Sequence, residues 1–175
     1  MITENEVLKQ GLKSVAEKML IAARTAPKGK GMNNLLISIA DSDDILEISA
    51  KMKEIGERTG ARAFIRDSEN IKLAPYMLLL AAKINPVNLM ICGSCGFKNC
   101  AEKNNHPEIP CVFNITDLGI AVGSAVALAA DHRVDNRIMY TVGIAVKELG
   151  LLGDEAAVIF GIPVSATSKN PFFDR

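Results

Sequence analysis

All four cysteine residues of this 175-residue chain fall within one stretch of twenty residues, CGSCGFKNCAEKNNHPEIPC. Spacers of two, four and ten residues separate them in turn, at Cys92, Cys95, Cys100 and Cys111. Gly93 and Gly96 lie among the first three and can adopt the backbone angles that a tight loop requires. Whatever its architecture, the chain must therefore hold one segment that wraps back on itself.

Clustered thiols of this kind are typical of a metal centre. Four thiolates are the usual ligands of a [4Fe–4S] or [2Fe–2S] cluster, and glycine amides nearby can donate hydrogen bonds to the cluster sulfur atoms. Pro110 stiffens the approach to the last ligand. We predict that the four cysteines bind one iron–sulfur cluster, with Cys111 the most distant ligand.

Two other interpretations use the same residues. A structural zinc ion needs four thiolates in a tetrahedron, although zinc ribbons usually pair two Cys-x2-Cys knuckles and only one is present. A redox dithiol would use Cys92 and Cys95 alone and leave two cysteines unexplained. His106, between the third and fourth cysteines, is a further candidate ligand, but an exposed loop histidine is the simpler interpretation.

Composition limits the class of protein. Apolar residues make up 49% of the chain, enough for a sizeable core, and the length suits a single domain spanning residues 1–175. Formal net charge is zero and no stretch is strongly basic, which argues against nucleic acid as a partner. The first ten residues, MITENEVLKQ, are polar, which argues against a secretory signal. The apolar run 118–130 is too short for a membrane span. We expect a cytoplasmic protein without membrane contact, where reducing conditions disfavour disulfides.

Hydrophobic periodicity predicts alternating helices and strands. Helices are expected at 4–23, 41–58, from Ser68 through YMLLLAA with a kink at Pro75, from Thr116 or Asp117 to 131, and at 134–149. Strands are expected at 35–40, 61–65, 87–91 and 156–160, followed by an irregular tail. This alternation indicates an α/β fold, an α+β sandwich with a central sheet flanked by helices, and the cysteine segment at a strand end.

The run CGSCGFKNCAE resembles the CGxCGxxxC segment of four-iron cluster domains in an electron-transport complex subunit and in corrinoid iron–sulfur proteins, whose fourth cysteine lies further on. Nearly the whole chain resembles an uncharacterised prokaryotic family of ferredoxin domain-containing proteins. AARTAPKGKG, CGSCGFKNC, DLGIAVGSAVALAADHRVDNR and GIPVSATSKNPFFDR carry that likeness. The resemblance implies a cluster of the [4Fe–4S] type.

ARTAPKGKGMNN, the stretch from Asp135 through VGIAVKELGL, and the closing GIPVSATSKNPFFDR also resemble the flavin-dependent nitroreductases. That resemblance implies a nitroreductase-like fold with FMN at a homodimer interface. Lys28 and Asn33 would then be cofactor-binding residues, assisted by Arg24, Lys30, Asn34 and Arg175. The paired arginines of that family are missing near the first helix, and Lys28 stands where a small hydroxyl is usual. A solvated helix end explains the same cations, since cations favour a helix C-terminus.

The leading hypothesis is therefore an iron–sulfur redox protein that exchanges electrons with a partner protein, a small-molecule acceptor or a bound flavin. The alternatives are a non-enzymatic domain with a four-cysteine zinc site and an FMN-dependent, nitroreductase-like oxidoreductase. The sequence names no catalytic residue or substrate.

Overall fold

The computed structural model describes residues 1–173. Its helices are α1 (Glu4–Thr25), α2 (Ser42–Thr59), α3 (Arg62–Ile71), α4 (Cys100–Lys103), α5 (Val112–Asp131) and α6 (Tyr140–Leu149), with a 3-10 turn, η1, at Gly29–Gly31. Its strands are β1 (Leu35–Ala40), β2 (Tyr76–Lys83), β3 (Asp135–Asn136) and β4 (Ala156–Ser165).

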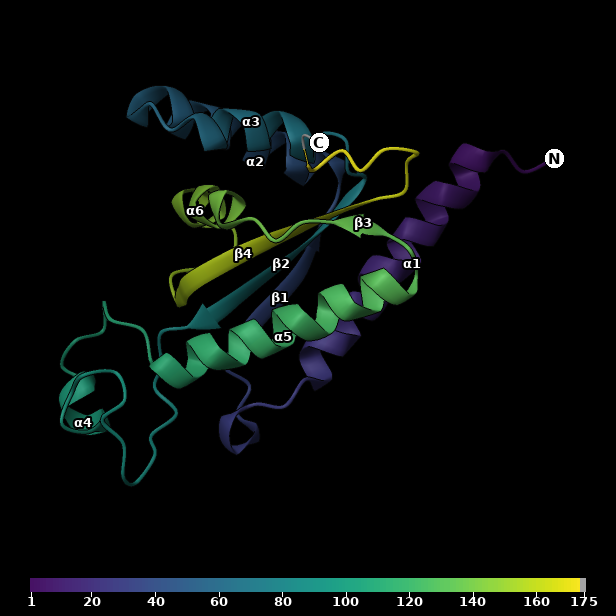
Figure 1. Cartoon of the computed structure of the whole chain (residues 1–175). Helices are drawn as coiled ribbons and strands as arrows, with labels where there is room; N and C mark the ends of the chain where they lie inside the picture. The colour runs from purple at the N-terminus through teal and green to yellow at the C-terminus, as the bar shows by residue number, and fades with distance from the viewer. Residues whose placement is uncertain (174–175) are drawn as a thin grey trace.

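The four strands form one antiparallel sheet in the order β1-β2-β4-β3. Leu35 on β1 lies opposite Ala82 on β2, and Tyr76 on β2 lies opposite Val164 on β4. Helices α1 and α5 cover one face of the sheet, and α2, α3 and α6 cover the other (Figure 1). The predicted sandwich of a central sheet flanked by helices is confirmed.

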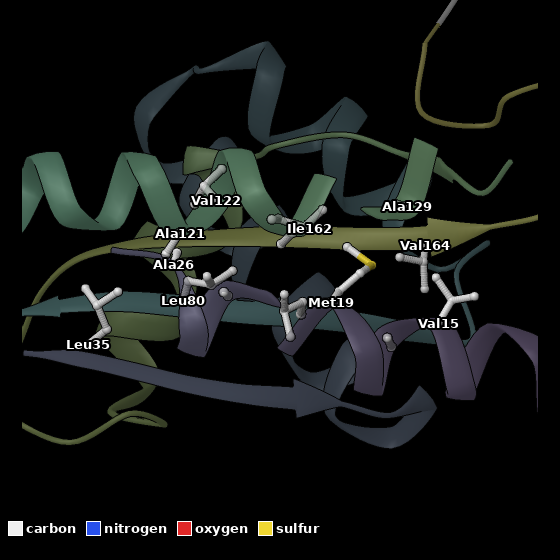
Figure 2. Close-up of a cluster of buried hydrophobic side chains, with 14 of the residues drawn as sticks. Val15, Met19, Ala26, Leu35, Leu80, Ala121, Val122, Ala129, Ile162 and Val164 are labelled. Atoms are coloured by element: carbon white, nitrogen blue, oxygen red, sulfur yellow. The ribbon is translucent and has the colours of Figure 1, made fainter. Parts of the chain in front are cut away.

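Strand β2 joins the cores on the two faces. Its side chains alternate between the α1–α5 face, with Leu78, Leu80 and Ala82, and the α2–α6 face, with Met77, Leu79 and Ala81. Figure 2 shows the first core, where Met19 from α1 and Ala121 from α5 meet Leu80 and Ile162 of the sheet. Burying a side chain of this size stabilises the fold by about 1.5–3 kcal/mol.

Local capping residues set the starts of α1 and α2 and the end of α2. Thr3 and Glu6 form a reciprocal capping box at the start of α1, and Asp41 and Asp44 form another at the start of α2. Gly60 ends α2 in the left-handed conformation. These bounds, and those of β1, follow the sequence predictions closely.

Two neighbouring predictions are wrong. Residues 61–65 were expected in a strand and begin helix α3, whereas YMLLLAA was expected in a helix and forms β2. Both faces of β2 are covered, so the strand is apolar throughout and lacks an alternating pattern. Pro75 immediately precedes the strand, a position that needs no ladder hydrogen bond from it.

Three other elements differ in their bounds. Residues 87–91 have no regular secondary structure, although a strand was predicted. Residues 135–136 pair with β4 as β3, so the predicted helix at 134–149 begins only at Tyr140. Strand β4 extends five residues beyond the predicted 156–160, to Ser165.

Helix α5 is long and apolar enough by length and composition to cross a membrane, and it is the one such helix among the described residues. It packs against α1 and the sheet through a face that includes Leu118, Ala121 and Ala125. It therefore serves as a core helix of this fold.

Candidate metal centre and neighbouring loop

The cysteines lie in one excursion, residues 84–111, which leaves the sheet at the end of β2 and returns at the start of α5 (Figure 1). Its regular structure is the four-residue helix α4, which begins at Cys100. Cys111 immediately precedes α5. The segment therefore follows β2, which ends at Lys83, and not a strand at 87–91 as expected, and the metal-binding loop stays a prediction.

The backbone of the excursion turns tightly between the first cysteines. Gly96 has φ +90, and its amide donates to the Gly93 carbonyl at 3.0 Å. A Cβ atom at Gly93 would lie 2.9 Å from the Phe97 carbonyl oxygen, so this position needs glycine. The glycines wrap the chain as predicted, but the Gly96 amide is used within the turn and is not free to donate to a ligand.

The four thiols are free and differ in exposure. Cys92, Cys95 and Cys100 are partly exposed, whereas Cys111 is 4% exposed. The Cys100 thiol donates to the Leu89 carbonyl oxygen at 3.9 Å. No three His, Cys, Asp or Glu side chains within residues 1–173 are grouped so as to hold one metal ion. The four-cysteine metal site therefore stays a prediction.

The donors fit a four-thiolate centre in type and number, and the start of α5 adds a second point of fit. Cys111 is the N-cap residue of this 20-residue helix, and no side chain caps the first-turn amides. Such amides favour a negatively charged acceptor. A thiolate or a cluster sulfide near Cys111 would meet this need, although the thiols of the excursion must first converge.

His106 is already engaged within the excursion. Its ring stacks on Phe97 at 4.9 Å between centroids, and its Nδ1 lies 3.4 Å from Glu108 Oε1. This arrangement agrees with the interpretation of His106 as an exposed loop histidine.

Lys28, predicted to bind a flavin phosphate, caps the end of α1. Its ammonium donates to the carbonyl oxygens of Ala23, Arg24 and Ala26 at 3.1, 2.8 and 2.7 Å. Burial lowers the pKa of Lys28, and the neighbouring Arg24 lowers it further, while Asp117 opposes the change. An ammonium has three donors. All three are used here, so Lys28 would have to leave α1 to bind a phosphate.

Asn33, the second predicted cofactor residue, is bonded to the same helix end. Its Oδ1 accepts from Arg24 Nη1, and Arg24 Nη2 also donates to the Leu35 carbonyl at 3.2 Å. Lys30 reaches the Asn88 carbonyl at 3.4 Å and so connects this loop with the cysteine excursion. Arg175 lies outside the described residues. The FMN assignment of Lys28 and Asn33 stays a prediction.

Sequence reasoning missed two buried polar residues of α5. Asp117, expected as a possible helix cap, lies inside the helix, 5% exposed, and accepts from the Gly29 amide at 3.1 and 3.0 Å. Asn114 accepts from Asn34 at 3.1 Å and donates to the Lys83 carbonyl at 2.9 Å.

These bonds join loop 26–34, the end of β2 and the first turns of α5. The available signal was an Asn and an Asp three residues apart at the start of a largely apolar stretch, a spacing that places both on one face of a helix.

The fold is similar to those of three solved structures, two of which are described as a nitroreductase or a nitroreductase family protein. A nitroreductase family protein from Clostridium novyi NT has a TM-score of 0.60 at 18% identity, with 88% of this chain and 74% of that chain covered. The FMN and NADPH-dependent nitroreductase NfnB from a Sphigopyxis strain has a TM-score of 0.56 at 14% identity, with coverages of 91% and 82%. An oxidoreductase containing FMN has a TM-score of 0.58 at 16% identity, with coverages of 90% and 68%. At these identities the likeness shows the fold, and the predicted nitroreductase-like fold is confirmed.

One relative and one family model match this chain at the level of sequence. An uncharacterized protein from Archaeoglobus fulgidus is 40% identical over 182 residues, which cover 100% of this chain and 97% of the relative. Residues 108–175, which include Cys111, match the family model described as "Uncharacterized protein containing a ferredoxin domain (DUF2148)". The chain therefore belongs to this family of ferredoxin domain-containing proteins.

Proposed function

We propose that this protein is an iron–sulfur redox protein in which Cys92, Cys95, Cys100 and Cys111 bind one cluster, of the [4Fe–4S] type. The observation that carries the proposal is that all four cysteines are free and lie in a single excursion between β2 and α5. When bound, such a cluster supplies one-electron transfer. The ferredoxin domain in the family description supports the same assignment.

The chain's own contribution is to hold the two ends of the excursion. Its first residues are fixed by the bond from Asn114 to Lys83 and by a further bond from Asn114 to the Asn85 carbonyl. Its last cysteine is buried at the start of α5. With both ends held, the four thiols stay within one excursion, and we propose that they converge by a rearrangement of residues 84–111.

The test is the composition of anaerobically purified protein. We expect brown protein with iron and acid-labile sulfide in equal amounts, and loss of both in Cys92→Ala. Thr116→Ala, which changes an exposed side chain of α5, is the matched control and should retain both. Colourless protein with one zinc per chain would instead support the four-cysteine zinc domain and overturn the proposal.

FMN is a second candidate cofactor. Its support is the position of loop 26–34. Two contacts hold this loop against α5, Gly29 to Asp117 and Asn34 to Asn114, and a third, from Lys30 to Asn88, reaches the cysteine excursion. A flavin on this loop would lie beside the proposed cluster, and proteins of similar fold are described as containing FMN. Protein purified from cells grown with riboflavin should release FMN into the supernatant when it is denatured. Flavin-free supernatant would remove this candidate.

We further propose a cytoplasmic homodimer that exchanges electrons with a partner protein or a small-molecule acceptor. The outer face of α5 carries no charged side chain between Thr116 and Ala130, and its exposed residues are Gly119, Ile120, Gly123 and Ala127. Small residues permit close approach of a second helix. Sedimentation should give a dimer for the wild type and a monomer for Gly123→Glu, and a monomeric wild type would contradict this proposal.

A further inference from the structure

The end of α3 contributes a buried amide group that has no hydrogen-bond partner. Asn70 is 9% exposed, and its Nδ2 is the one buried side-chain nitrogen or oxygen within residues 1–173 that makes no hydrogen bond. Leaving a buried donor unpaired costs about 1–3 kcal/mol. Buried amides normally meet an acceptor, so the free donor of Asn70 requires an explanation.

Asn70 lines an open cavity of about 470 Å³ between the end of α3 and the C-terminal segment that follows β4 (Figure 1). Leu73, Pro171 and Phe173 give this cavity apolar walls, and Lys169 lies at the same cavity. A volume of this size suits a small organic molecule. The unpaired amide therefore lies in the wall of a space that a ligand could enter.

The C-terminal wall of the cavity is held by contacts with the rest of the fold. Phe172 is fully buried in the core on the α2–α6 face, and its carbonyl oxygen accepts from Arg137 Nη1 at 2.8 Å. The Arg137 guanidinium also lies over the Phe173 ring, 5.0 Å from its centroid. Asn170 Oδ1 accepts from the Phe172 amide at 2.9 Å. This wall is thus a packed part of the structure.

The charge at the cavity favours an anion. Lys169 is exposed, and its ammonium forms no ion pair within the described residues. None of the described residues that line the cavity is acidic. An ammonium and an unpaired amide donor call for a ligand with a negative group and acceptor oxygens, and the apolar walls call for a ligand with a ring.

We propose that this cavity binds a flat organic phosphate, and that FMN binds here. The inference rests on FMN as the second candidate cofactor proposed above, and it assigns the binding donors to Asn70 and Lys169. Lys28 and Asn33 are bonded at the end of α1, whereas these two donors are free within the described residues. The two positions are distinct, because the cavity lies at the start of β2 and loop 26–34 lies at its end.

The experiment measures the affinity of flavin-free, full-length protein for FMN and for riboflavin, from the change in flavin fluorescence. Riboflavin has the same ring and lacks the phosphate. Asn70→Leu keeps the side-chain volume, removes the amide and should weaken the binding of both flavins about 3- to 10-fold. Lys169→Met should weaken the binding of FMN about 2- to 10-fold and leave riboflavin unchanged. Lys18→Met, an exposed substitution on α1, is the matched control and should change neither affinity.

Thermal unfolding of the same flavin-free proteins separates ligand binding from a structural role. Because the Asn70 donor is unpaired, Asn70→Leu should be at least as stable as the wild type. A less stable Asn70→Leu that binds FMN as the wild type does would mean that the amide serves the fold. That result would overturn the inference.

Failure of the FMN candidate has a different signature. If the wild type binds FMN and both cavity variants bind it equally well, the flavin lies elsewhere and only this inference is overturned. If the wild type binds neither flavin, the FMN candidate is wrong and the inference fails with it. The iron and sulfide content of the protein tests the proposed cluster independently of either outcome.

Discussion

The ammonium of Lys28 is bonded to three carbonyl oxygens at the end of α1, and this contact competes with any phosphate. We expect Lys28→Met to lower the free energy of unfolding by about 1–3 kcal/mol, because the last carbonyls of α1 lose a charged donor. Chemical denaturation measures this change. Lys18→Met, an exposed substitution on the same helix, should stay within about 0.5 kcal/mol of the wild type.

Flavin content distinguishes the two roles of Lys28. If the side chain binds a phosphate instead, Lys28→Met will lose FMN at unchanged stability, and the helix-capping role will be wrong.

Gly143 on α6 lies against the backbone of β4. A Cβ atom here would be 1.8 Å from the Ile159 carbonyl oxygen, so any side chain forces α6 away from the sheet. We expect Gly143→Ala to destabilise the protein at or beyond the upper end of the range of about 1–3 kcal/mol for overpacking. Its thermal midpoint should fall accordingly.

Gly11 supplies the matched control, since it also lies inside a helix but has no atom within 4 Å of an added Cβ. Gly11→Ala should stabilise the protein by about 0.5–1 kcal/mol. Equal effects at the two positions would mean that α6 does not pack on β4 at this distance.

At the scale of elements, α5 holds loop 26–34 through Asp117. The carboxylate accepts the Gly29 amide, so Asp117→Ala leaves a part-buried donor without its acceptor. We expect a loss of about 1.5–3 kcal/mol and faster hydrogen exchange at the Gly29 amide. Thr116→Ala, on the exposed side of the same turn, should leave both quantities unchanged. An unaltered Gly29 exchange rate in Asp117→Ala would contradict the contact.

The elements that could be predicted were those with local signals. Capping boxes and amphipathic periodicity located α1 and α2, and the short apolar run before Asp41 located β1. The signals failed for β2, because covering a strand on both faces removes the alternation and leaves Leu, Met and Ala, which also favour helices.

The candidate site was predictable only where its residues are adjacent in sequence. The cysteine excursion could be recognised from its spacing. The bonds of Asp117 and Asn114 join residues 29 to 88 positions apart, and they depend on the docking of α5 beside loop 26–34, which no local pattern encodes.

For the whole molecule, β2 couples the two cores. Its side chains alternate between the two cores, so neither core can unfold without exposing one face of this strand. We therefore propose that residues 1–175 form a single domain and expect one cooperative transition in denaturant, with coincident curves from circular dichroism and Tyr fluorescence.

Met19→Ala and Met52→Ala remove matched side chains from opposite cores and should each shift that single midpoint, with a cost of about 2–5 kcal/mol. Two separate transitions, each moved by one of the variants, would instead indicate two independent units.

The excursion at residues 84–111, outside the sheet and the helices that cover it, contains all four proposed ligands of the cluster (Figure 1). The most direct measurement is the Mössbauer spectrum of protein reconstituted anaerobically with isotope-enriched iron and sulfide. We predict that the iron gives the spectrum of one sulfide-bridged, thiolate-bound cluster, and that each of Cys92→Ala, Cys95→Ala and Cys100→Ala loses it. Iron present only as isolated ions, or a cluster spectrum that is unchanged in all three variants, would contradict the assignment of these cysteines.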